Sequence, residues 1–163
     1  MNAVQYIAVI GGWDDRLSKV SMVEVVSISY EGVVSSSTCQ SSELEVAFAA
    51  LSGNLICGGK NPEERTKITN ECKELNPESF KWKERSPMKK KRINHAMTTA
   101  NNQTRYVCGG DDEFGTRLKS CEKFDREWSF IKDLPIPLNS HCMIGTEDSI
   151  YAIGGMDESG VSE

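Results

Sequence analysis

Acidic side chains gather directly after glycine pairs, and they are the first candidates for chemistry. Asp14 and Asp15 follow one pair closely, and Asp111, Asp112 and Glu113 follow another. Two neighbouring carboxyl groups can act as general acid and base, but adjacent acids in a loop are usually solvated. We therefore interpret Asp14, Asp111 and Asp112 as part of an acidic rim that contacts a partner, and not as catalytic groups.

A basic run and an isolated tryptophan are the other candidates for partner contact. The run Lys89-Lys90-Lys91-Arg92 follows a proline-bearing stretch. Such a run normally forms a solvated turn, although it can also dock an acidic segment. Trp13 stands next to a glycine pair and has no counterpart later in the chain. The predicted partner-binding residues are therefore Trp13, Asp14, Asp111, Asp112, Lys89, Lys90, Lys91 and Arg92.

The other residues that could take part in catalysis or in binding a metal or a phosphate lack the spacing that such sites need. The two histidines, His95 and His141, are 46 residues apart, and no Cys-x-x-Cys or His-Glu-x-x-His pattern accompanies them. The sequence contains no Gly-x-Ser-x-Gly nucleophile elbow and no Gly-x-Gly-x-x-Gly phosphate loop. We predict a protein that is not an enzyme, with no catalytic, cofactor-binding or metal-binding residue and no cofactor.

Four of the six cysteines recur at equivalent places. Cys57 and Cys108 each precede a glycine pair, and Cys72 and Cys121 are 49 residues apart. In a reducing compartment such cysteines behave as small apolar core residues, and we favour this interpretation. The alternative is a cross-strand disulfide inside each unit, Cys57 with Cys72 and Cys108 with Cys121, which secretion would be needed to sustain.

The elements that position these residues come in repeated segments. Four times an apolar run leads into a glycine pair, and successive pairs are 47, 51 and 45 residues apart. Recurrence at such an interval indicates a repeat architecture, in which each unit buries its apolar face against its neighbours. Other positions hold a constant interval too: Val23, Cys72 and Cys121 are 49 residues apart, and Trp82 and Trp128 are 46 apart.

Each unit contains short alternating segments separated by turns, and these predict four antiparallel strands. One strand ends at the glycine pair, the next two lie at 72–76 and 82–85 or at 121–125 and 128–131, and a further strand begins at His95 or His141. No segment has a sustained 3.6-residue apolar period. The fold is therefore expected to be all-β, and four-stranded meanders of this length are typical of propeller blades.

Taken in order, these features resemble kelch repeats. The second unit has the Pro-Met-x-x-x-Arg-x-x-His stretch, at Pro87, Met88, Arg92 and His95, whereas the third has Leu138 where the second has Arg92. The resemblance implies a kelch-type β-propeller of four-stranded antiparallel blades over residues 1–163. We expect blades at about 6–44, 45–92 and 93–138 and a partial blade at 139–163. This is an incomplete ring of about three blades, which other chains or further blades would close.

Composition narrows the class of partner. The chain has 24 acidic and 19 basic residues, which argues against a nucleic-acid surface. Its first residues resemble neither a signal peptide nor a membrane span, so we expect a cytoplasmic protein. The kelch resemblance implies a protein-interaction scaffold or adaptor whose loops contact a protein partner, of the cytoskeletal or ubiquitin-ligase kind. The alternatives are a structural segment of a larger multi-subunit assembly and a kelch-like sugar-modifying enzyme.

Overall fold

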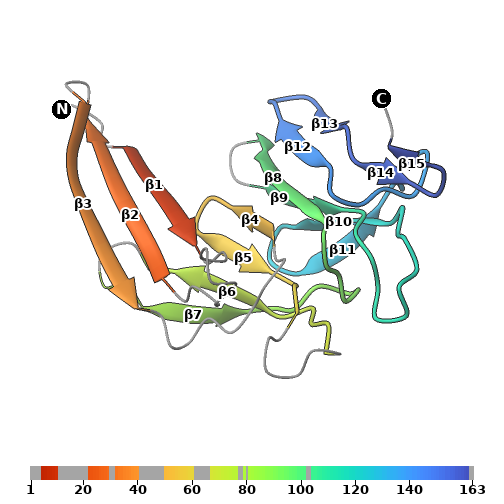
Figure 1. The fold of residues 1–163 in the computed structure, drawn as a ribbon, viewed down its shortest axis with the longest axis horizontal. Coiled ribbons are helices and arrows are strands. Elements are labelled where there is room, and N and C mark those ends of the chain that lie inside the picture. Colours follow the sequence, from red (N-terminus) through yellow and green to blue (C-terminus); the bar gives the residue numbers. More distant parts are fainter. Residues whose placement is uncertain are drawn as a thin grey trace. The chain divides into compact units, whose positions relative to one another are not determined.

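The computed structural model describes residues 5–10, 22–29, 32–40, 50–60, 67–76, 79, 81–101 and 104–161 (Figure 1). Every strand pairing in these residues is antiparallel, and they contain no α-helix, so this part of the chain is all-β as predicted. It accordingly contains no helix with the length and hydropathy needed to cross a membrane. The chain divides into two compact units, residues 1–47 and 48–163.

The first unit contains a three-stranded antiparallel sheet in the order β1-β2-β3. Its strands are β1 (Gln5–Ile10), β2 (Met22–Ser29) and β3 (Gly32–Gln40). Ile10, which precedes the first glycine pair, lies opposite Val23, and the β2-β3 register shifts between Ser27 and Ile28. The serine-rich run Ser35-Ser36-Ser37-Thr38 lies in β3.

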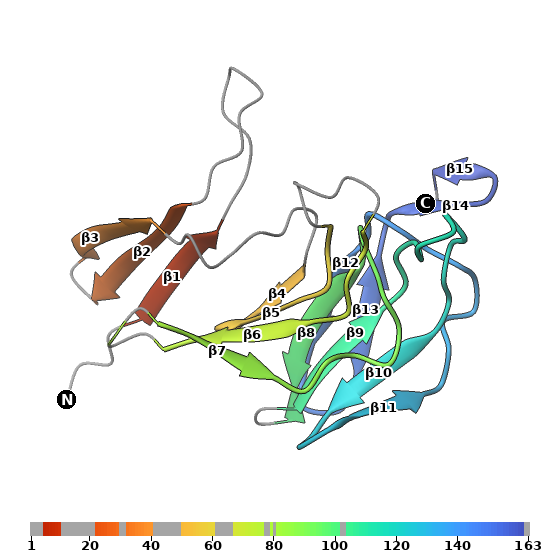
Figure 2. The same cartoon turned by 90° about the horizontal axis from the view of Figure 1, so that it is seen from below.

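Two four-stranded sheets form most of the second unit, and in each the strands lie in chain order. The first consists of β4 (Ala50–Ser52), β5 (Leu55–Cys57), β6 (Cys72–Leu75) and β7 (Trp82–Arg85). The second consists of β8 (Ala96–Ala100), β9 (Thr104–Cys108), β10 (Cys121–Phe124) and β11 (Trp128–Ile131). Both are the antiparallel meanders that the sequence predicts (Figure 2).

The sheets repeat one another residue by residue. Cys57 lies opposite Cys72 in the first sheet, and Cys108 lies opposite Cys121 in the second. The tryptophans also take equivalent places, with Trp82 opposite Leu75 and Trp128 opposite Phe124. Strand β8 contacts β4 on one side and β12 on the other, so the first strands of successive sheets are neighbours.

The last sheet of this unit has two strands, β12 (Cys142–Gly145) and β13 (Ile150–Ile153). After the final glycine pair the chain forms a small hairpin from β14 (Met156–Asp157) and β15 (Gly160–Val161). The Asp157 carboxylate accepts hydrogen bonds from the Ser159 N–H and hydroxyl, and this local capture turns the chain back.

An apolar core joins the two complete sheets. Its central members are the buried residues Leu55, Cys57, Cys72, Met88, Met97, Val107 and Trp128. Trp128 is 2% exposed, its ring centroid lies 5.2 Å from that of Phe124, and its indole N–H donates to the Ser86 carbonyl at 3.0 Å. Because Ser86 follows β7 and Trp128 opens β11, the Trp128 side chain packs between the two sheets. Trp82 is half-buried.

The cysteines correct the interpretation that we favoured. Cys57 is bonded to Cys72 and Cys108 to Cys121, each pair across neighbouring strands. Direct opposition on antiparallel strands brings the two Cα atoms to 4.1 and 4.2 Å, close enough for the sulfur atoms to meet. These four residues are therefore disulfides rather than buried thiols, and Cys142 is a free, exposed cysteine.

The glycine pairs are required by backbone conformation and by space. Gly58 and Gly109 have φ angles of 68° and 65°, in the left-handed region that favours glycine. A Cβ atom on Gly109 would lie 2.4 Å from the Leu138 carbonyl oxygen, and one on Gly58 would lie 2.8 Å from the Arg92 carbonyl oxygen. These glycines therefore permit the close approach of neighbouring backbone segments.

Candidate functional site

The loop between β9 and β10 presents an aromatic side chain to solvent. Phe114 is 85% exposed, the largest exposure among the large apolar residues that the structure describes. Asp112 holds the loop in shape, since its Oδ1 atom accepts the N–H groups of Phe114 at 2.9 Å and Thr116 at 2.8 Å. We call residues 111–118 the Phe114 loop.

Backbone bonds complete this loop. The Asp112 N–H donates to the Thr116 carbonyl at 3.0 Å, and the Gly115 N–H donates back to the Asp112 carbonyl at 3.0 Å. At its base Leu118 N–H donates to the Gly110 carbonyl at 2.8 Å, and Asp111 forms a bridge with Arg117. The loop is thus a closed turn whose conformation is set before any partner arrives.

An open hollow of about 490 Å³ lies beside the Phe114 loop. Its walls come from segments that follow the glycine pairs of both complete sheets and from the residues facing them. The lining residues are Lys60, Ile68, Ile93, Asp111, Asp112, Glu113, Gly115, Arg117 and Asn139. Two predicted site residues, Asp111 and Asp112, therefore belong to one concave surface.

The charges in this hollow are largely paired. Asp111 Oδ2 accepts the side-chain amides of Asn94 at 3.2 Å and Asn139 at 2.7 Å, and Asp111 Oδ1 lies 3.7 Å from Arg117 Nε. Glu113 forms an ion pair with Lys91. With Asp111 bonded in this way and Asp112 capping its own loop, the carboxyl groups organise the backbone rather than forming an acid and base pair.

The basic run divides into exposed and buried parts. Lys89 and Lys90 are exposed, and Lys91 reaches Glu113 on the Phe114 loop. Arg92 contradicts our prediction of partner contact, because its side chain is 0% exposed. Its guanidinium lies 2.9 Å from Glu122 Oε1 and donates to the carbonyls of Gly109 and Ser120. The structure therefore brings Lys91, Asp111 and Asp112 together and removes Arg92 from the surface.

The remaining predicted contact residues, Trp13 and Asp14, lie outside the described residues. Phe114 was missed by sequence reasoning, which weighed this loop only for its acids. The signal was present as a single aromatic residue in an otherwise polar stretch, Asp111-Asp112-Glu113-Phe114-Gly115-Thr116-Arg117. What the sequence could not show is that this side chain stays 85% exposed.

Both histidine side chains are buried. His95 Nε2 lies 3.1 Å from the Cys57 carbonyl oxygen, and burial, reinforced by the Arg92 charge, lowers the His95 pKa to about 3. Burial also lowers the pKa of His141. The described part of the chain contains no group of three or more His, Cys, Asp or Glu side chains that could hold a metal ion.

Comparison with known proteins gives one weak similarity. Alpha-scruin from Limulus polyphemus is 27% identical to this chain over 108 residues. The aligned region covers 62% of this chain, and the chain spans only 12% of alpha-scruin. Alpha-scruin is a kelch-repeat protein, so the similarity indicates kelch-like repeats and nothing more specific. No protein-family model matches the chain.

Proposed function

We propose that this chain is a kelch-type interaction module that binds a protein partner through the Phe114 loop. The observation that carries the proposal is the exposure of Phe114 on a turn locked by Asp112. Aromatic residues are enriched among the few side chains that dominate binding energy at interfaces. A loop already held in its bound shape loses little conformational entropy on association.

The surroundings of Phe114 specify the chemistry of the partner. The adjoining hollow is lined by charged, polar and apolar residues, and several of its charges are paired. Lys89 and Lys90 are exposed and directly precede Lys91, which forms an ion pair with Glu113. A partner that suits this surface has an apolar pocket for the phenyl ring, bordered by acidic groups that pair with the lysines. A cytoskeletal protein or a ubiquitin-ligase component with such a pocket is the class that kelch resemblance favours.

The architecture that we propose for the module is a β-propeller. Two four-stranded meanders with equivalent registers and neighbouring first strands support it. In a propeller the loops beyond the glycine pairs gather on one face, which is where binding residues usually lie. The proposal assigns no catalytic step to this face and describes the module as a scaffold.

A comparison of two phenylalanine variants tests the proposal. Phe114→Ala removes the proposed anchor, and Phe130→Ala removes a phenylalanine that is 54% exposed on β11. Tagged wild-type chain and both variants are used to capture proteins from cells that express it, and captured proteins are quantified by mass spectrometry. We expect at least one protein to be retained by wild type and Phe130→Ala and reduced more than tenfold by Phe114→Ala. Identical capture by all three chains would overturn the proposal.

A further inference from the structure

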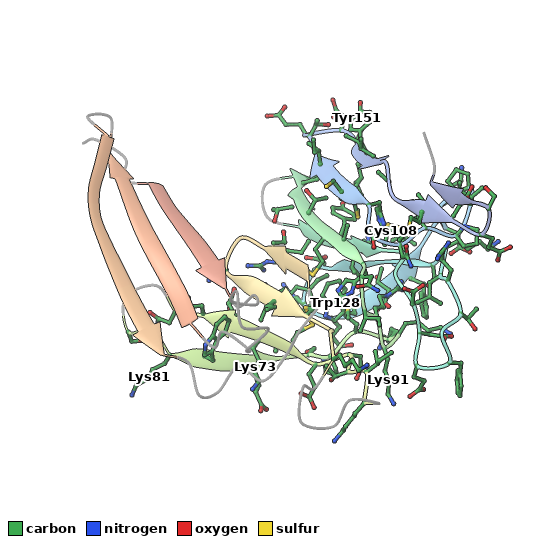
Figure 3. The ribbon with its side chains drawn as sticks, viewed as in Figure 1. Lys73, Lys81, Lys91, Cys108, Trp128 and Tyr151 are labelled. Carbon is green, nitrogen blue, oxygen red and sulfur yellow. A yellow bond between two sulfur atoms is a disulfide. The ribbon has the colours of Figure 1, made fainter. Side chains whose placement is uncertain are left out.

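The outer edge of β11 carries an exposed aromatic residue. The sheet has the order β11-β10-β9-β8, and the chain continues from β11 into β12 and β13, so this edge belongs to the rim of a complete four-stranded sheet. Within the described residues β11 pairs only with β10. Trp128 at its start is 2% exposed and lies among packed side chains (Figure 3), whereas Phe130, two residues further on, is 54% exposed.

The register of the sheet turns the backbone of Phe130 toward this outer edge. Cys108 and Cys121 lie opposite each other with their Cα atoms 4.2 Å apart, the narrow spacing of a non-hydrogen-bonded pair. The backbone groups of Cys121 therefore point away from β9 and toward Ile131, its partner on β11. Because backbone groups alternate in direction along a strand, the N–H and carbonyl of Phe130 point away from β10.

The equivalent strand of the first complete sheet is protected by charge. By the shared register, Glu84 on β7 stands where Phe130 stands on β11. Its neighbours Lys83 and Arg85 are charged as well, and all three side chains are exposed. Charged side chains on an edge strand discourage pairing with another chain. The residues of β11 carry no charge, so this strand lacks that protection.

Exposed lysines lie around the end of β11 that carries Phe130. Lys132 follows the strand directly. Glu122, which lies opposite Phe130, accepts the backbone N–H groups of Lys89 at 2.6 Å and Lys90 at 3.1 Å, so this turn of the preceding sheet is a neighbour of Phe130. The three lysine side chains are exposed, and none forms an ion pair with another residue that the structure describes.

The acids that adjoin this end of β11 already have partners. Glu122 is buried, with one carboxylate oxygen 2.9 Å from the Arg92 guanidinium, and Asp133 lies 3.8 Å from Lys119. The exposed acids of the 125–127 turn lie at the other end of β11. The charge that remains available beside the exposed phenyl ring is therefore positive, and an acidic partner complements it.

We propose that the outer edge of β11 binds an extended acidic segment of a partner protein by strand addition. The segment runs antiparallel to β11, so its residue opposite Phe130 exchanges two main-chain hydrogen bonds with Phe130. That residue is aromatic, because aromatic pairs across neighbouring strands are favourable. The residue two positions before it comes opposite Lys132 and is acidic.

A second copy of this chain fits the edge less well than an acidic segment. If two copies paired about Phe130, the Trp128 of one would come opposite the Lys132 of the other, and the lysine charge would stay without a partner. The edge of β11 is separate from the Phe114 loop, and its proposed role does not depend on the function proposed for that loop.

Three synthetic peptides test the proposal on the full chain. The parent is a fluorescent ten-residue peptide that contains Glu-Glu-Thr-Phe-Thr. One control replaces both glutamates by lysine, and the other carries N-methylphenylalanine, whose backbone nitrogen cannot donate a hydrogen bond. We expect the parent to bind in fluorescence anisotropy and each control to bind at least tenfold more weakly. A control that binds as well as the parent, or no binding by any peptide, would overturn the proposal.

Protein variants locate the binding and separate it from the Phe114 loop. Phe130→Ala should weaken the parent peptide at least tenfold, and Lys132→Glu should weaken it at least threefold. Lys83→Glu makes the same charge change at an exposed lysine of β7 and should leave binding unchanged. Phe114→Ala should also leave it unchanged, so this proposal and the function proposed for the Phe114 loop can fail independently. Self-association that Phe130→Ala abolishes, without peptide binding, would assign the edge to a second copy of this chain and overturn the proposal.

Discussion

The guanidinium of Arg92 and the carboxylate of Glu122 lie 2.9 Å apart, with both side chains completely buried. Arg92 follows β7 and Glu122 lies on β10, so the pair connects two neighbouring sheets. Burial lowers the pKa of Arg92, an effect opposed by the hydrogen bond to Glu122. Removing one partner of such a buried pair is costly, because the other charge then stays buried without a counter-charge and without contact with water.

We predict that Arg92→Leu lowers the free energy of unfolding by about 3–5 kcal/mol, since it leaves Glu122 buried without its counter-charge. The double variant with Glu122→Leu should lose much less than the sum of the two single variants, because it removes both charges. Urea unfolding of the wild type, the two single variants and the double variant measures the interaction energy between Arg92 and Glu122. Strictly additive losses would show that the two residues do not stabilise each other.

We predict that the chain loses stability between pH 6.5 and 3 in a manner that depends on His95. The folded pKa of His95 is about 3, whereas an unfolded histidine titrates near 6.5. Below pH 6.5 the unfolded chain therefore binds a proton that the folded chain does not, and stability falls as pH falls. Within this window, the proton taken up by the unfolded His95 lowers the free energy of unfolding by up to about 1.4 kcal/mol per pH unit.

His95→Gln removes this titration and keeps an amide that can donate to the Cys57 carbonyl. Thermal unfolding from pH 7 to 4 should therefore show a flatter pH profile for His95→Gln than for wild type. His141 shifts in the same direction, so His141→Gln is measured alongside. Parallel profiles for wild type and His95→Gln would contradict the prediction.

We predict that Gly109→Ala destabilises the chain far more than Gly53→Ala does. Both glycines have positive φ angles, 65° and 62°, so each substitution carries a conformational cost of about 1–2 kcal/mol. Only Gly109 is also crowded, with 2.4 Å between its added Cβ and the Leu138 oxygen, whereas nothing lies within 4 Å of a Cβ on Gly53. The stabilities of the two variants are compared by their denaturant unfolding midpoints. Equal midpoints would show that lack of space at Gly109 does not add to the cost of the substitution.

We predict that alkylation without reduction labels Cys142 and leaves Cys57, Cys72, Cys108 and Cys121 unlabelled. The sulfurs of these four residues are bonded in pairs, and Cys142 is exposed and free. Disulfides persist in oxidising compartments, so the state of these cysteines in the cell has to be preserved. The protein is therefore alkylated at once on cell lysis and analysed by peptide mass. Labelling of Cys57, Cys72, Cys108 and Cys121 as well would mean that the two pairs are reduced in the cell, as the cytoplasmic expectation requires.

Reduction should also lower the unfolding temperature. Each disulfide closes a short loop, with sequence separations of 15 and 13 residues. Loops of this size constrain the unfolded chain by about 3 kcal/mol in the chain-entropy model. A Cys108→Ala, Cys121→Ala variant serves as the control, since reduction should affect it less than wild type.

The strands could be predicted closely because their causes are local. Alternating apolar residues, glycine pairs and short polar turns act within a few neighbours along the chain, and two sheets and their registers follow from them. Within the site, the loop containing Asp111 and Asp112 was found in the same way. Phe114 was missed and Arg92 was misjudged, because the exposure of one and the burial of the other depend on residues far away in the sequence. Glu122, for example, is 30 residues from Arg92.

By itself the sequence determined the repeat unit, its antiparallel meander and the places of its glycines, tryptophans and cysteines, because short-range periodicity and spacing carry that information. Tertiary structure alone decided that the paired cysteines are bonded, that Arg92 turns inward to Glu122 and that Phe114 stands in solvent. Each of these depends on which distant segments lie side by side. Packing between sheets therefore decides which of the charged and apolar residues remain available for binding.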